Sequence, residues 1–161
     1  MKIKFITAGG TIDKVYFDAK SEYKVGSPQV LDVLREGNAT CEYDIESVLA
    51  KDSLDMTDED RNLIRAKVEA DAASRIVITH GTDTMIQTAL ALQNIPGKTI
   101  VLTGSMQPAR FRNTDANFNI GVALGAVQSL PPGVYIAMNG QVFDPRRLRK
   151  NRDKLCFESD V

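Results

Sequence analysis

The chain of 161 residues is poor in the side chains that build metal sites and disulfide frameworks. It has one histidine, two cysteines and no tryptophan. Cys41 and Cys156 lie far apart in the sequence, and together with His80 they cannot complete a zinc ligand set. We therefore expect no metal site, and we interpret the cysteines as incidental thiols.

An excess of charge of one sign is also missing. Twenty Lys and Arg stand against twenty-one Asp and Glu, which gives a net charge of -1. This balance gives the protein no net positive charge to attract a polyphosphate backbone, which argues against a nucleic-acid partner. No apolar run approaches the roughly 20 residues of a spanning helix, and the N-terminus passes directly into an alternating segment. We expect a cytoplasmic protein that does not associate with membranes.

The composition suits one hydrophobic core. Hydrophobic residues make up 43% of the chain and charged residues 25%. A chain of this size buries roughly 70% of the surface that its unfolded form exposes, so it needs no covalent or metal crosslinks. We predict a single domain over residues 1–161.

Short apolar runs alternate with segments of helical spacing. The strands that we expect cover residues 3–8, 43–49, 75–80, 98–103 and 134–138. The helices that we expect begin at residue 30, with Gly37 as the stop, and cover residues 57–74, 83–93 and 115–129. We expect the helix 83–93 to pack through Met85, Ala89 and Leu92, and the last helix through Phe118, Val122, Leu124 and Val127.

The alternation predicts an α/β fold in three layers. A mostly parallel sheet would carry helices on both faces, as in Rossmann and flavodoxin-like proteins. Residues 11–28 lack periodicity and carry three aromatic side chains, which predicts a long loop or loose hairpin acting as a lid. Ligands of such sheets lie beyond the carboxyl ends of the strands, which are Ala8, Leu49, His80, Thr103 and Met138.

Three loops at this edge present hydroxyl groups beside glycine or an acid. They contain residues 9–11 (GGT), 52–53 (DS) and 81–84 (GTDT). Gly10 and Gly81 would let a ligand approach the backbone closely, and the hydroxyls can act as nucleophiles or donors. Each triplet also has a structural interpretation, since threonine suits strand ends and caps helices, with Thr82 as a candidate N-cap.

Phosphate-binding motifs are incomplete. Residues 97–99 (GKT) resemble the end of a phosphate loop, but Leu92 stands where the first glycine is required. The Gly9–Gly10 pair lacks the third glycine of a dinucleotide fingerprint. His80 lies two residues from Thr82, and we expect its ring to be hydrogen-bonded locally instead of acting as a base.

A hydroxyl nucleophile without histidine needs another base, and lysine is the usual replacement. Residues 146–152 (RRLRKNR) contain Lys150 among arginines. Free lysine titrates near 10.4, so a base at neutral pH would need its pKa lowered by about three units. A solvated basic surface and a nucleic-acid contact are the alternatives for this segment.

Five separated segments resemble the bacterial-type L-asparaginases. They are residues 7–12 (TAGGTI), 78–85 (ITHGTDTM), 102–108 (LTGSMQP), 115–119 (DANFN) and 138–150. They occur in the family's order and cover nearly the whole chain. The resemblance implies hydrolysis of the side-chain amide of L-asparagine to aspartate and ammonia, with neither a metal nor an organic cofactor.

The resemblance also implies roles for individual residues. Thr11 matches the family's favoured nucleophile, and Tyr23 the loop tyrosine that orients it. Thr82, Asp83 and Lys150 match a set that activates a hydroxyl or the attacking water. The remaining matches bind substrate: Ser53 and Asp83 hold its α-carboxylate and α-amino ends, the Ser105 carbonyl faces its amide, and the backbone N–H groups of Thr11 and Thr82 are candidate oxyanion donors.

Two departures from the family stand out. Leu54 occupies a position that is usually polar. Typical members also continue into a second domain, which completes the α-amino site of a neighbouring subunit, whereas this chain ends about where the linker would begin. We interpret it as the N-terminal catalytic domain alone, either a natural short form or a fragment, and expect a homo-oligomer.

Two alternatives remain open. One is a module that binds asparagine without turnover, or an incomplete subunit that waits for a second domain. The other is the amidase subunit of a tRNA-dependent amidotransferase, which the basic segment at Lys150 favours slightly. The preference between asparagine and glutamine depends on about one methylene of room and is not set by these residues.

Overall fold

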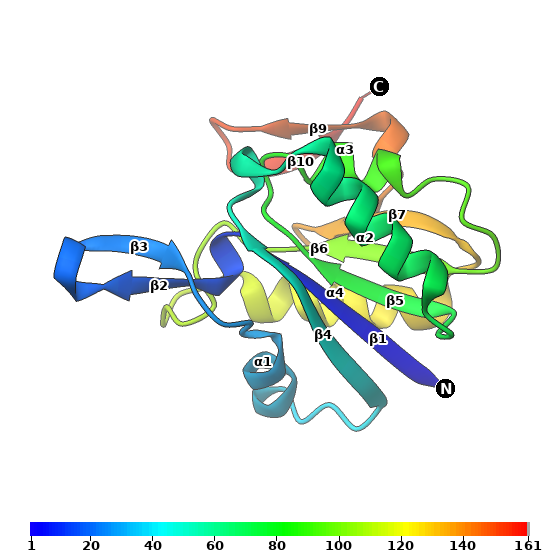
Figure 1. Ribbon diagram of the computed structural model, residues 1–161, viewed down its shortest axis with the longest axis horizontal. Coiled ribbons are helices and arrows are strands. Elements are labelled where there is room, and N and C mark those ends of the chain that lie inside the picture. Colours follow the sequence, from blue (N-terminus) through cyan, green and yellow to red (C-terminus); the bar gives the residue numbers. More distant parts are fainter. Residues whose placement is uncertain (161) are drawn as a thin grey trace.

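The computed structural model describes residues 1–160 and places a mixed sheet of six strands at the centre of the molecule (Figure 1). All neighbouring strands are parallel except β7 and β8, which are antiparallel. The mostly parallel sheet predicted from the alternation is confirmed. In spatial order the strands are β4 (Glu42–Lys51), β1 (Lys2–Gly9), β5 (Arg75–Thr79), β6 (Thr99–Thr103), β7 (Gly133–Met138) and β8 (Gln141–Phe143).

Helices cover both faces of this sheet, as predicted. On one face α1 (Val30–Glu36) and α4 (Ala116–Ser129) pack over a cluster that contains Phe5 and Val77. On the other face α2 (Asp58–Ala70) and α3 (Met85–Ala91) pack over a cluster that contains Ile6 and Ile78. Successive residues of a strand point to opposite faces, so the two buried clusters divide the same strands between them.

Helix ends depart from the predicted bounds. The predicted start of α2 is confirmed, because Thr57 and Asp60 form a reciprocal capping box. Its predicted extension to residue 74 is wrong, since Asp71 adopts an extended backbone and its carboxylate accepts the Ala73 N–H at 2.8 Å. The α3 helix begins at Met85 with Thr84 at its N-cap position, so Thr82 is not the cap.

The packing face of α4 is partly mispredicted. Phe118 is 61% exposed, whereas Ile120, Ala123 and Val127 are buried. Phe118 lies two residues from Ile120, which is about 200° around a helix, so it points away from the sheet. The packing face of α3 is confirmed, because Met85, Ala89 and Leu92 are buried.

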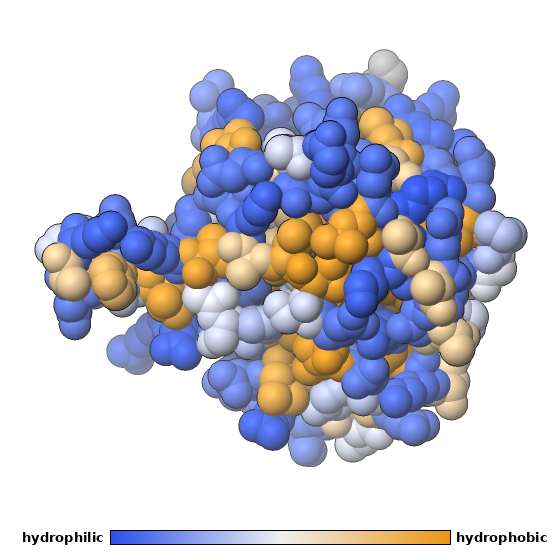
Figure 2. Space-filling view, viewed as in Figure 1, coloured by the Kyte–Doolittle hydropathy of each residue, from blue (hydrophilic) through white to orange (hydrophobic). Residues whose placement is uncertain are grey.

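Residues 11–28 form the hairpin that was one of the predicted options. A 3₁₀ turn (Thr11–Asp13) leads into β2 (Lys14–Phe17), a second 3₁₀ turn (Asp18–Lys20) and β3 (Glu22–Val25). The hairpin projects from the body of the molecule (Figure 1). Figure 2 shows apolar residues along it beside hydrophilic ones, and its Tyr16 and Tyr23 are each about half exposed.

The segment after β8 contains two strands that the sequence did not indicate. β9 (Leu148–Asn151) and β10 (Cys156–Ser159) form an antiparallel pair, preceded by a 3₁₀ turn (Pro145–Arg147). Leu148 and Phe157 anchor the pair in the core on the α2–α3 side. Within residues 1–160, no helix is both long and apolar enough to cross a bilayer.

Candidate active site

Three turns at the carboxyl edge of the sheet touch one another through glycines. Gly10 follows β1 with φ 91°, and a Cβ there would collide with the backbone of Gly81, which follows β5. A Cβ on Gly81 would in turn come within 2.6 Å of the Cβ of Ser53, which follows β4. The absence of side chains therefore brings the turns of Thr11, Thr82 and Ser53 into contact.

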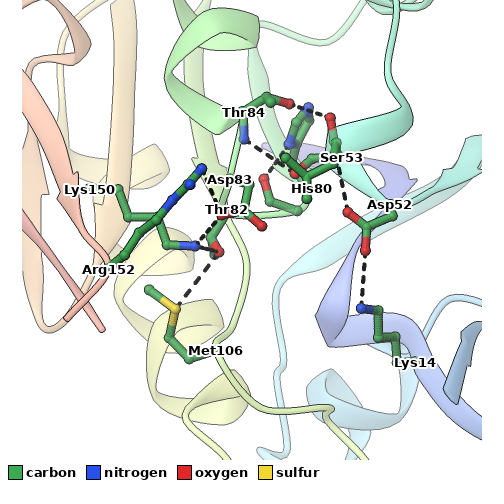
Figure 3. A network of polar contacts seen from close by, with 12 residues as sticks. Lys14, Asp52, Ser53, His80, Thr82, Asp83, Thr84, Met106, Lys150 and Arg152 are labelled. Carbon is green, nitrogen blue, oxygen red and sulfur yellow. Dashed lines mark hydrogen bonds and ion pairs between the residues drawn. The ribbon is translucent and has the colours of Figure 1, made fainter. Parts of the chain in front are cut away.

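Lys150 joins this edge from β9, outside the main sheet (Figure 3). Its Nζ donates to Thr82 Oγ1 at 2.8 Å and to Asp83 Oδ1 at 2.9 Å. The Lys150 side chain is 13% exposed, so water screens this pair only weakly. Arg152 approaches the same Asp83 oxygen at 3.5 Å, which gives the carboxylate two cationic neighbours.

The loop after β6 closes one side of Thr82. The Thr82 hydroxyl donates to Met106 Sδ at 3.8 Å, a weak bond to a soft acceptor. Ser105 beside it is buried, and its hydroxyl donates to the carbonyl of Gln107. Thr82 thus has a lysine on one side and a thioether on the other.

Ser53 is held by the start of α3. Its Oγ accepts the Thr84 N–H at 3.2 Å, and the Thr84 hydroxyl donates to the Ser53 carbonyl at 2.7 Å. Partial burial acts to raise the pKa of the neighbouring Asp52, but the Leu54 N–H and the Lys14 ammonium outweigh it and lower that pKa below its ordinary value. Leu54 itself is 65% exposed.

His80 is buried and locally hydrogen-bonded, as predicted. Its Nδ1 lies 2.7 Å from the Gly81 carbonyl, which can only accept, and its Nε2 lies 2.8 Å from the Thr88 hydroxyl. Burial lowers the pKa of His80 to about 4, so the ring is neutral at pH 7 and accepts a bond from Thr88. Both ring nitrogens are occupied, and His80 braces the Gly81 turn.

Thr11 and Tyr23 are not joined by a hydrogen bond within residues 1–160. Thr11 opens the first 3₁₀ turn beside the Gly10–Gly81 contact. Tyr23 lies on the hairpin, where its ring packs against Tyr16 and Phe111 with centroids 5.4 and 5.6 Å away. A hollow of about 530 Å³ separates hairpin and sheet, and it is lined by Tyr23, Lys14 and Asp52 among others.

No three His, Cys, Asp or Glu side chains gather as a metal site would need in the part of the chain that the structure describes. The site offers hydroxyls, lysines, carboxylates and backbone amides. Such a set can deliver a hydroxyl nucleophile, a proton acceptor and an oxyanion cradle.

Residues 2–159 match the family model described as asparaginase, N-terminal. The chain belongs to the asparaginase family. The L-asparaginase of Thermococcus kodakarensis is 34% identical over 158 residues, which are 93% of this chain and 48% of that protein. A solved structure of that asparaginase superposes with a TM-score of 0.86 at 32% identity, covering 99% of this chain and 51% of the other.

Two further relatives widen the comparison. The structure of L-asparaginase I from Vibrio cholerae gives a TM-score of 0.84 at 29% identity, covering 98% of this chain and 51% of the other. A glutamyl-tRNA(Gln) amidotransferase subunit from Methanococcus vannielii is 32% identical over 88% of this chain and 35% of that protein. The chain spans about half the length of the asparaginases that it matches.

Sequence reasoning did not identify two side chains at or near this candidate site, Arg152 and Asp13. Arg152 belongs to the basic segment but was not assigned to Asp83. Asp13, at the base of the hairpin, was not singled out, although it is buried and its Oδ1 accepts the Gln29 N–H at 2.9 Å. Burial raises the pKa of Asp13 to about 7, against the smaller opposing effect of that hydrogen bond. The sequence signal that could have identified Asp13 was an acidic residue directly after an apolar one in the turn that follows a strand.

Proposed function

We propose that this chain hydrolyses the side-chain amide of L-asparagine to L-aspartate and ammonia without a metal or organic cofactor, with glutamine as a possible second substrate. The observation that carries the proposal is the contact of Lys150 Nζ with both Thr82 Oγ1 and Asp83 Oδ1. This contact links residues 67 and 68 positions apart, next to the turn of Thr11. Membership of the asparaginase family supports the same reaction.

The proposed reaction has two halves. Thr11 Oγ attacks the amide carbon, the C–N bond breaks, and the nitrogen leaves as ammonia with the proton of the Thr11 hydroxyl. Water then attacks the resulting ester, which releases aspartate and returns the proton to Thr11. Tyr23 orients Thr11 when the hairpin lies over the site. In its neutral form, Lys150 takes a proton from the Thr82 hydroxyl or from the attacking water, and Asp83 fixes its position.

The remaining residues bind substrate in this proposal. The Ser53 hydroxyl already accepts the Thr84 N–H, which leaves its hydrogen for the substrate's α-carboxylate. Asp83 receives the α-amino group, and the Ser105 carbonyl faces the amide. Gly10 and Gly81 let the turns that carry Thr11, Thr82 and Ser53 meet closely around the ligand, and the N–H groups of Thr11 and Thr82 hold the oxyanion. A second copy of the chain covers the open side.

Ammonia release by the 161-residue chain tests this function, with asparagine and glutamine side by side. Thr11→Val and Thr82→Val are each expected to abolish nearly all release, because each removes a hydroxyl in the proposed machinery. Thr40→Val is the matched control, since Thr40 is exposed and precedes the amino end of β4. Full activity in both site variants would refute the assigned roles.

A binding module without turnover is the first alternative. Calorimetry that detects asparagine binding by a chain that releases no ammonia would favour it. A tRNA-dependent amidase is the second, because one group of relatives consists of amidotransferase subunits. Arg146, Arg149 and Lys154 are paired with acids, which leaves less positive charge for a phosphate backbone. Salt-dependent retention of tRNA would nevertheless support it.

A further inference from the structure

A chain of amide contacts runs from the loop after β6 to the strand that carries Lys150. Its centre is Asn119 on α4, which is 1% exposed. Asn119 Nδ2 donates to the Gly104 carbonyl and to Asp115 Oδ2, each at 3.0 Å, while its Oδ1 accepts the Asn139 N–H at 3.2 Å. A buried side chain that uses both ends of its amide in this way has one fixed orientation.

One end of this series of amide contacts fixes the loop that contacts Thr82. The Asp115 carboxylate accepts the Met106 N–H at 2.9 Å and the Gln107 N–H at 3.0 Å. Met106 is the residue whose sulfur receives the Thr82 hydroxyl. Asp115 and Asn119 therefore tie the loop beside Thr82 to the first turn of α4.

The other end of this series of amide contacts reaches β10 through Asn139. Asn139 lies between β7 and β8 with φ 54°, a left-handed conformation that asparagine tolerates better than most residues. Its Oδ1 accepts the Phe157 N–H at 2.9 Å. Phe157 is the direct partner of Lys150 across the β9–β10 pair.

We propose that Asn139, oriented by Asn119, is a positioning residue that sets Lys150 against Thr82, an inference that rests on the function proposed above. Leu148 and Phe157 bury their side chains in the core, but apolar packing is not directional. The hydrogen bond from Phe157 to Asn139 fixes the strand pair relative to the main sheet. Lys150 then meets Thr82 and Asp83 at bonding distance.

Two substitutions at Asn139 separate the side chain from the backbone. Asn139→Gly retains the left-handed conformation and deletes the acceptor of the Phe157 N–H. Asn139→Asp retains an acceptor oxygen at an exposed position and serves as the rescue variant. Asn38→Gly is the matched control, because Asn38 is also exposed and left-handed, with φ 50°, but follows α1.

Amide exchange and backbone resonances measure the positioning directly. In Asn139→Gly, the Phe157 amide is expected to exchange about tenfold faster or more, and the amide signals of Lys150 and Thr82 are expected to shift. In the ammonia assay kcat should fall by about tenfold with KM within about twofold, since Lys150 acts on the reacting atoms. Asn139→Asp and Asn38→Gly should stay close to the original chain in every measurement.

The two proposals fail in different ways. A parent chain that releases no ammonia refutes the proposed function, and the resonances of Lys150 and Thr82 then decide the positioning alone. Unchanged resonances in Asn139→Gly overturn the positioning inference. In an active chain it is also overturned if the resonances shift while kcat stays the same, because the bond would then be structural only.

Discussion

The two threonines of the candidate site are held very differently. Thr82 lies between Lys150 and Met106, and its turn is braced by His80 and Thr88. Thr11 stands at the base of a projecting hairpin, and no hydrogen bond links its hydroxyl to Tyr23 within residues 1–160. The contacts of Thr82 with Lys150 and Met106 are already formed, whereas the contact between Thr11 and Tyr23 is not.

This difference suggests a division of labour. Proton transfer requires the lysine to be held close to its hydroxyl. Rigid support of Thr82 and Lys150 therefore favours the reaction. A nucleophile must be accessible to the entering substrate, and loops at the end of a sheet provide that access. Four substitutions test the comparison, from the largest expected effect to the smallest.

Removing the Lys150 amine should remove the proposed proton acceptor beside Thr82. We expect Lys150→Met to lower kcat for ammonia release by a factor on the order of 10² to 10⁴, the usual contribution of a general base. Lys67→Met is the control, because Lys67 also pairs with an acid, Glu46, but on the surface of α2. Equal activities of the two variants would show that Lys150 takes no part in the reaction.

The hairpin base should respond to pH through Asp13. Its pKa is raised from 3.8 to about 7, so the folded chain binds more protons than the unfolded chain in that range, and Asp13 reduces stability as pH rises. Asp13→Asn keeps an acceptor for the Gln29 N–H and removes the buried charge. We expect it to stabilise the fold at pH 7 or above by up to about 4 kcal/mol in urea unfolding.

His80 acts with the opposite sign. Its pKa is lowered to about 4, so the unfolded chain binds more protons between that value and 6.5, and stability rises with pH there. Asp13 and His80 offset each other between about pH 4.5 and 6.5. The parent chain should therefore show a shallow profile and Asp13→Asn a rising one. A falling profile in Asp13→Asn would contradict the assignment of His80, and identical profiles in the two chains would contradict that of Asp13.

Removing the hydrogen bond between Thr88 and His80, behind Thr82, should have a smaller effect. Thr88→Val leaves His80 Nε2 buried without its partner, which we expect to lower the free energy of unfolding by about 1 to 3 kcal/mol. Thr88→Ser keeps the hydroxyl and should recover most of that loss. If valine and serine give the same stability, the Thr88 hydroxyl does not support the turn.

Tyr23→Phe should have the smallest effect and act only on the reaction. The Tyr23 residue is 51% exposed, so stability should change by less than about 0.5 kcal/mol. If its hydroxyl orients Thr11 in the closed hairpin, kcat should fall by about tenfold. Tyr16→Phe, across the hairpin, controls for loss of a phenol. An unchanged kcat in Tyr23→Phe would leave Thr11 without this partner.

Much of the fold was predictable because its signals are local. Alternating runs and helix-start signals identified the central strands and the helices, including the start of α2 at Thr57. The β9–β10 pair was not predictable, since the sequence of β9 is mostly charged and polar. Its place depends on Leu148 and Phe157 reaching the core and on Asn139 accepting from Phe157. Phe118 was mispredicted because hydrophobicity alone does not say which face of a helix is covered.

By itself the sequence determined the α/β layering, the edge of the sheet where the hydroxyls gather, and the family resemblance. Only the tertiary structure decided the distances at which Lys150 meets Thr82 and Asp83. It also decided that Thr88 is the second partner of the His80 ring, and that no hydrogen bond joins Tyr23 to Thr11 within residues 1–160. Periodicity and turn chemistry are properties of neighbouring residues. Contacts between residues nearly 70 positions apart depend instead on how strands, turns and core side chains pack together.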